Sequence, residues 1–128
     1  EFFHINKPNV LIVENVENGK TFFQQHQIMI VPLWSGSGLR IKIIEGMAYG
    51  KAIVSTTIGA EGIHCTHKKN ILIADSADDF ANDVIALLQN NNMRKELETN
   101  AAYFSKEQFD NMKVVLGLIT FLKSIANE

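Results

Sequence analysis

The chain has 128 residues, of which 46% are hydrophobic and 20% are charged, and its formal net charge is −2. This size and composition are typical of an ordinary globular protein, so we expect a single domain over residues 1–128. The lack of any block of Lys or Arg argues against a nucleic-acid-binding surface, which needs a basic footprint. One cysteine cannot form an internal disulfide, which indicates a reducing, cytoplasmic setting.

The two ends of the chain add two expectations. The chain begins at Glu1 without an initiator methionine, so we interpret it as a cut from a longer polypeptide. The longest apolar run covers residues 114–122, which is shorter than the roughly 20 residues that cross a bilayer. We therefore predict no transmembrane segment and interpret this run as part of a buried helix.

Four short runs of β-forming residues are apolar throughout instead of alternating with polar residues. They cover residues 9–13, 28–31, 52–56 and 70–74. Continuous apolarity is typical of parallel strands covered on both faces, and helical patterns lie between and after these runs. We therefore predict an α/β, Rossmann-like three-layer domain, with a mostly parallel sheet of about four strands, helices on both faces and further helices at the C-terminal end.

Capping and helix-breaking residues mark the predicted helices. A short helix covers residues 21–25, and a longer one covers residues 39–49 and ends at Gly50. Ser76 and Asp79 form a capping-box pattern that begins the next helix. The break at residues 90–92 separates it from another helix, and the last helix covers residues 112–126.

The segment from Val31 to Glu45 joins a buried strand, a Gly-Ser-Gly loop and a helix. Ligands of open α/β sheets bind beyond the carboxyl ends of the strands, and a helix N-terminus offers backbone N–H groups and a positive dipole to a phosphate. Gly36 and Gly38 let the backbone approach that phosphate closely. Glu45 lies about 10 Å along the helix, a distance that suits the ribose of a nucleotide.

A plainer interpretation of the same residues stays open. The glycines can form an ordinary tight turn, and Lys42 with Glu45 can form an exposed ion pair three residues apart. Trp34 either lines the ligand cleft or packs at the end of the sheet. The loop is neither a P-loop nor a dinucleotide-binding fingerprint, because it lacks the lysine of the first and the third glycine of the second.

Residues 31–63, VPLWSGSGLRIKIIEGMAYGKAIVSTTIGAEGI, closely resemble the C-terminal domain of glycosyltransferase family 4, which has the GT-B fold. The resemblance continues more loosely through residues 71–90 and 94–109. It implies a retaining transferase that binds a nucleotide-sugar in the cleft between two Rossmann-like domains. Glu45 matches the second of two glutamates in the family motif, the one that contacts the donor ribose. Gly38 matches the glycine that begins the cradle of the diphosphate.

The resemblance also has departures. Ser37 stands where the first glutamate of the family lies, so the catalytic group that meets the transferred sugar is unknown. Arg40 stands where a second glycine is usual, and we expect its side chain to reach a phosphate. The segment at Asn15 and Val16 resembles the one whose backbone meets the nucleobase. The expected donor-binding residues are Gly36, Ser37, Gly38, Leu39, Arg40, Lys42, Glu45, Asn15 and Val16, with no metal and no cofactor besides the nucleotide-sugar substrate.

Parts of the family's fold have no counterpart in this sequence. The N-terminal acceptor domain is missing, and so are the first strand and its two phosphate-neutralising cations. We therefore expect the chain alone to be inactive, and any membrane association to occur through the missing domain. We also expect either a rearranged four-strand sheet, with residues 9–13 beside residues 28–31, or a homodimer through the free strand edge or the last helix.

Two other classes of function remain as alternatives. The first is a non-catalytic nucleotide-binding or protein-interaction domain, which is compatible with the loss of the first glutamate. The second is a receiver-like signalling module, which is disfavoured because no aspartate follows the strands at residues 28–31 and 52–56. A metal centre at His64, Cys65 and His67 is also disfavoured, because one loop supplies at most three donors.

Overall fold

Three short parallel strands form the sheet of this protein, in a computed structural model that describes residues 7–126. β1 (Ile28–Val31), β2 (Ala52–Ser55) and β3 (Leu72–Ile73) lie in the order β1-β2-β3. All four residues of β2 are buried, as expected for a central strand covered on both faces. β1 is an edge strand, and the side chain of Ile30 is 54% exposed.

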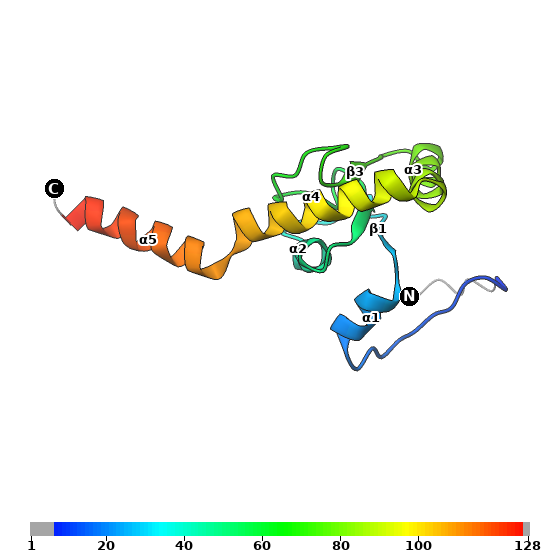
Figure 1. Ribbon diagram of the computed structural model, residues 1–128, viewed down its shortest axis with the longest axis horizontal. Coiled ribbons are helices and arrows are strands. Elements are labelled where there is room, and N and C mark those ends of the chain that lie inside the picture. Colours follow the sequence, from blue (N-terminus) through cyan, green and yellow to red (C-terminus); the bar gives the residue numbers. More distant parts are fainter. Residues whose placement is uncertain (1–6, 127–128) are drawn as a thin grey trace.

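Five helices accompany the sheet in the described part of the chain (Figure 1). They are α1 (Gly19–Gln25), α2 (Ile41–Ala48), α3 (Ala77–Gln89), α4 (Asn91–Phe109) and α5 (Asn111–Ala126). At the start of α3 the Ser76 hydroxyl oxygen accepts the N–H of Asp79 at 3.1 Å, which confirms the predicted cap. The Asn90 side chain caps α4 in the same way, and the break predicted over residues 90–92 is reduced to Asn90, because α4 already begins at Asn91.

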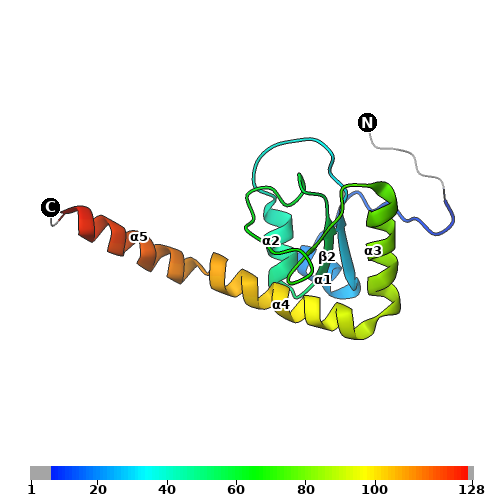
Figure 2. The same ribbon diagram turned by 90° about the horizontal axis from the view of Figure 1, so that it is seen from above.

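Alternate residues of β2 point to two separate parts of the core. Ile53 packs with Ile43 and Met47 of α2, while Val54 belongs to the cluster that contains Phe80 and Leu87 of α3. Figure 2 shows α2 and α3 on opposite sides of the sheet, with α4 running across from one to the other. The predicted three-layer α/β class, with a parallel sheet and helices on both faces, is confirmed.

The strand predicted at residues 9–13 does not form. These residues lie in an exposed segment outside the sheet, and Leu11 is 85% exposed. Figure 1 shows this segment, in dark blue, running well away from the strands. A β-forming sequence becomes a strand only where a neighbouring strand accepts its hydrogen bonds. The sheet therefore has three strands, and the expectation that residues 9–13 pair with β1 is wrong.

The last helix forms as predicted but is not covered. No residue of α5 is buried, and it extends beyond the rest of the molecule (Figures 1 and 2). Large apolar side chains such as Met112 and Phe121 are 67% and 60% exposed. The expectation that residues 114–122 are buried is wrong for the described chain. Among residues 7–126, no helix combines the length and the apolar character needed to cross a membrane.

Candidate functional site

The segments that follow the three strands meet at the carboxyl edge of the sheet, because the strands are parallel. The Thr56 hydroxyl after β2 donates a hydrogen bond to the carbonyl of Leu33 after β1. The indole N–H of Trp34 donates to the carbonyl of Asp75 after β3 at 3.0 Å. These contacts join residues that are 23 and 41 positions apart, and they connect the segments that follow the three strands.

The loop between β1 and α2 has the backbone shape that its glycines allow. Gly36 has a φ of 122° and Gly38 a φ of 90°, in the region that side chains disfavour. A Cβ added at Gly36 would also lie 2.6 Å from Nη2 of Arg40. Residues 34–39 are all exposed, so their backbone is accessible to a ligand.

Arg40 closes the loop at the start of α2. Its Nη1 donates a hydrogen bond to the Ser37 carbonyl at 2.6 Å, while its Nε is buried and has no hydrogen-bond partner. A guanidinium carries five N–H donors in one plane, so one bond to a carbonyl leaves most of them unused. Arg40 is also the N-cap residue of α2, and its side chain does not cap the helix. A positive charge therefore lies beside the positive end of the helix dipole.

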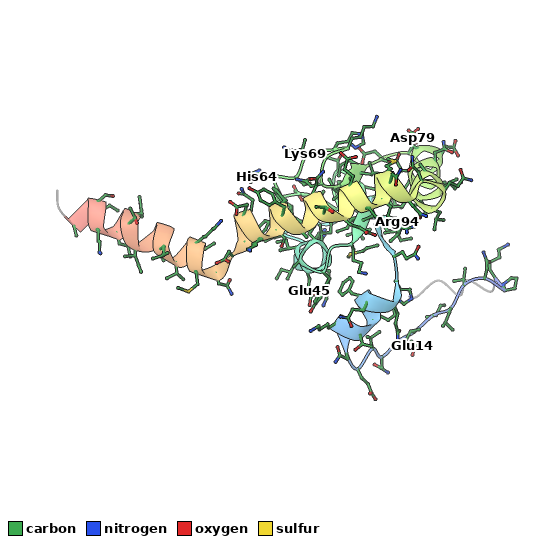
Figure 3. All side chains as sticks on the ribbon, viewed as in Figure 1. Glu14, Glu45, His64, Lys69, Asp79 and Arg94 are labelled. Atoms are coloured by element: carbon green, nitrogen blue, oxygen red, sulfur yellow. The ribbon has the colours of Figure 1, made fainter. Side chains whose placement is uncertain are left out.

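Lys42 and Glu45 form an ion pair, with Lys42 Nζ 2.8 Å from Glu45 Oε2. This is the contact of the plainer interpretation given above. The two side chains are 74% and 37% exposed, and such surface pairs contribute about 0–1 kcal/mol. Figure 3 shows Glu45 extending from α2 on the side of the molecule where α1 lies. The expected contact of Glu45 with a donor ribose stays a prediction.

A hollow of about 470 Å³ lies beside the start of α2, along the edge of β1. Apolar side chains form most of its wall, among them those of Ile30 and Leu39. Among the described residues, the charged groups that line it are Arg40 and Lys42, both cationic, and Lys42 is paired with Glu45. Such a combination of an apolar wall and a few charged groups is typical of small-molecule sites.

The structure does not bring every predicted donor-binding residue together. Asn15 and Val16 lie in the exposed segment before α1, and no backbone hydrogen bond found within residues 7–126 joins them to the glycine loop. Conversely, sequence reasoning missed Asp75 and Thr57. The Asp75 carboxylate accepts the backbone N–H of Thr57 at 2.8 Å and its hydroxyl at 2.7 Å. The position of Asp75, two residues after the end of β3, is the signal that could have revealed it.

The His-Cys segment has other contacts. His67 Nδ1 accepts the backbone N–H of Ile73 at 2.8 Å, which ties the loop to the end of β3. Cys65 is half-buried, and its burial raises the pKa of the thiol. Within residues 7–126, no group of three or more His, Cys, Asp or Glu side chains is arranged to hold a metal ion. These two residues therefore have contacts that serve the fold.

Comparison with known sequences identifies relatives of the chain. Residues 3–90 match the family described as glycosyl transferases, group 1. An uncharacterized 44.6 kDa protein of the cps region of Klebsiella pneumoniae is 30% identical over 109 residues, covering 85% of this chain and 28% of that protein. An uncharacterized glycosyltransferase of Methanocaldococcus jannaschii is 36% identical over 90 residues, covering 69% of this chain and 23% of the relative. The chain spans only about a quarter of the length of these relatives.

Solved structures share the fold. Sucrose-phosphate synthase of Thermosynechococcus elongatus matches with a TM-score of 0.69 at 16% identity, over 83% of this chain and 27% of that one. The C-terminal domain of a group 1 glycosyl transferase of Francisella tularensis matches with a TM-score of 0.64 at 16% identity, over 77% of this chain and 53% of that one. At this identity the likeness shows the fold alone. Because the family match covers more than half of the chain, the protein belongs to the group 1 family of glycosyl transferases, which has the GT-B fold.

Proposed function

We propose that this chain is the donor-binding part of a retaining glycosyltransferase, which binds a nucleotide-sugar and transfers its sugar to an acceptor held by a separate N-terminal domain. The observation that carries the proposal is the glycine loop, which has two glycines at positive φ and leads into α2 beside Arg40. Exposed backbone N–H groups, a helix N-terminus and a guanidinium are the groups that bind a diphosphate.

The unpaired nitrogen of Arg40 supports a phosphate at this position. A buried donor without a partner costs about 1–3 kcal/mol, and a shift of the Arg40 side chain that exposed Nε to a phosphate oxygen would satisfy it. Lys42 is exposed and pairs only with Glu45, so it is free to turn towards the same anion. That movement would release the Glu45 carboxylate, which can then accept the two hydroxyls of the donor ribose. Binding of the two parts of the nucleotide is thus coupled through one weak ion pair.

The chemistry at this site is stabilisation of the leaving group. As the bond between the sugar and the diphosphate breaks, negative charge develops on the departing phosphate oxygens. Under this proposal Arg40 and the N–H groups at the start of α2 lie close to that charge, Lys42 turns towards it, and donors preorganised in this way lower the barrier. Ser37 stands where the family's first glutamate contacts the sugar, and we assign no residue of this chain to the attack on the sugar carbon.

The rest of the enzyme lies in a longer polypeptide under this proposal. The chain covers about a quarter of its relatives, and one structural neighbour is named as the C-terminal domain of a group 1 transferase. The acceptor site would lie in the missing N-terminal domain, together with any contact with a membrane. The 128 residues alone should bind the donor in the cytoplasm and transfer no sugar.

A thermal-shift titration of the chain with UDP, GDP, ADP and inorganic pyrophosphate tests the proposal. A ligand that binds only the folded state raises the melting temperature. At least one nucleoside diphosphate should raise it, and Arg40→Ala should abolish most of that rise. Lys95→Ala is the matched control, because it removes one exposed cation from α4. No shift with any of the four ligands, or an equal shift in Arg40→Ala, would contradict the assignment of the loop.

A second candidate is a non-catalytic nucleotide-binding domain, which Ser37 in place of the glutamate favours. The two candidate functions predict the same ligand binding by this chain, and they predict different activities for the longer protein. A transferase should release nucleoside diphosphate slowly from the nucleotide-sugar even without an acceptor, whereas a binding domain should release none. A coupled assay of nucleotide release by the longer protein distinguishes them.

A further inference from the structure

Asp75 contacts the segments that follow both other strands. Its carboxylate accepts two hydrogen bonds from Thr57 after β2, and its carbonyl accepts the indole N–H of Trp34 after β1. Asp75 is itself fixed from both sides, because the Ala74 N–H donates to the carbonyl of Ser55 at 2.9 Å and α3 begins two residues later. One residue thus joins the ends of all three strands.

Trp34 is the residue through which this junction reaches the glycine loop. It is 52% exposed, yet its indole is held by the Asp75 carbonyl and its ring lies 6.3 Å from that of Phe80, at the start of α3. It is also the first residue of the exposed loop over residues 34–39. The far end of that loop is held by the bond from Arg40 to the Ser37 carbonyl. The two glycines therefore lie between two anchors.

We propose that Asp75 is a positioning residue for the donor diphosphate: its carboxylate, bonded to Thr57, fixes its backbone, whose carbonyl holds Trp34 and through Trp34 the glycine loop in the shape that receives the phosphates. This proposal rests on the function proposed above and adds a residue that touches no ligand. A loop with two glycines at positive φ has many other conformations, and ordering it during binding would weaken the affinity. The anchor at Trp34 removes part of that cost before the ligand arrives.

The charge of Asp75 separates this role from a direct electrostatic one. A carboxylate near a phosphate site repels the anion, so its removal would strengthen binding if charge alone mattered. If Asp75 acts by positioning the loop, its removal should instead weaken binding of the anion. In Asp75→Asn the amide oxygen can still accept the Thr57 N–H and the NH₂ group can donate to the Thr57 hydroxyl oxygen, so both hydrogen bonds to Thr57 lose their charge assistance and become weaker. The loop then loses order, and binding weakens although a negative charge has been removed.

Trp34 is the single tryptophan of the chain, so its fluorescence reports directly on the loop. The test measures time-resolved fluorescence anisotropy and the affinity for inorganic pyrophosphate in the 128-residue chain. Asp75→Asn and Thr57→Val should increase the fast motion of Trp34 and weaken pyrophosphate binding at least fivefold. Thr57→Ser keeps the hydroxyl and should behave as the wild type. Asp78→Asn removes the same charge from the first turn of α3 and serves as the charge-matched control.

The outcomes are distinguishable. Unchanged anisotropy together with unchanged pyrophosphate affinity in Asp75→Asn would overturn the proposal, as would tighter binding. Circular dichroism of each variant verifies that its helices are intact, and Thr57→Val provides a second route if Asp75→Asn does not fold. If the wild type binds neither pyrophosphate nor any of the three nucleoside diphosphates, the proposed function fails and the ligand part of this inference fails with it. The anisotropy of Trp34 still decides whether Asp75 orders the loop.

Discussion

Replacement of Gly59 by alanine should destabilise the fold at the edge that carries the site. Gly59 is buried in the turn after β2, and its N–H donates to the Thr56 hydroxyl oxygen at 3.0 Å. An added Cβ would collide with Oγ of Ser55 and would lie 3.0 Å from the carbonyl oxygen of Val31. The φ of Gly59 lies outside the left-handed region, so the effect is steric rather than conformational.

The size of the effect follows from what has to move. Ser55 is 0% exposed, and its hydroxyl donates to the carbonyl of Thr56 at 3.1 Å. If the side chain rotates away, that buried bond is lost, at a cost of about 0.5–1.5 kcal/mol. The carbonyl of Val31 is backbone and cannot turn aside, so overpacking adds about 1–3 kcal/mol. We expect Gly59→Ala to lower the free energy of unfolding by about 2–4 kcal/mol, a large part of the roughly 5–15 kcal/mol of a typical domain.

Urea denaturation followed by circular dichroism measures this loss. Gly19→Ala is the control, because no atom lies within 4 Å of its added Cβ, and its stability should change by less than about 0.5 kcal/mol. The double variant Ser55→Ala/Gly59→Ala removes the colliding hydroxyl and should be more stable than the sum of the two single changes implies. Gly59→Ala with wild-type stability, or additive effects in the double variant, would refute the steric argument.

Three further predictions concern the site and its surroundings. In the longer enzyme, Glu45→Ala should weaken donor binding by about 1–3 kcal/mol, and an unchanged affinity in calorimetry would remove Glu45 from the site. The hydrogen bonds from Thr57 hold the pKa of Asp75 below its ordinary value of 3.8. The stabilisation by these hydrogen bonds is therefore complete above pH 3.8, and it is lost as the pH falls through the lowered pKa and the carboxylate is protonated. Trp34 emission should therefore be constant from pH 7 to about 5 and change below 3.8, a step that Asp75→Asn should lack. The free edge of β1 and the uncovered α5 should make the chain dimerise at high concentration. Ile30→Lys places a charge at that edge and should weaken the dimer. Light scattering that gives a monomer at every concentration would contradict this prediction.

Local patterns in the sequence were sufficient for most of the fold. The continuous apolar run at β2 predicted a strand covered on both faces, and all four of its residues are buried. The cap at Ser76 acts within three residues of itself, so the chain order alone revealed it, while Asn90 was predicted only as part of a break and not as the cap that it forms. The ion pair between Lys42 and Glu45 is the plainer of the two interpretations that the sequence left open, and it was recognisable because residues three apart in a helix are neighbours.

Features that depend on distant residues could not be predicted in this way. Residues 9–13 have a strand composition, but whether they form a strand depends on a neighbour that no local pattern reveals. The bonds of Asp75 to Thr57 and Trp34 join positions 18 and 41 residues apart. The sequence rule predicted a site at the carboxyl edge of the sheet, yet only the packed structure shows which polar groups at that edge contact one another.

The exposure of α5 has a consequence for the cooperativity of folding. An isolated helix of 16 residues is marginally stable in water, and α5 has no buried residue that ties it to the core. Its amide protons should therefore exchange with solvent almost as fast as those of an unfolded peptide, while those of β2 exchange only through global opening. The helix then unfolds and refolds without disturbing the sheet. Any partner that covers its apolar side chains would supply the free energy that keeps it helical.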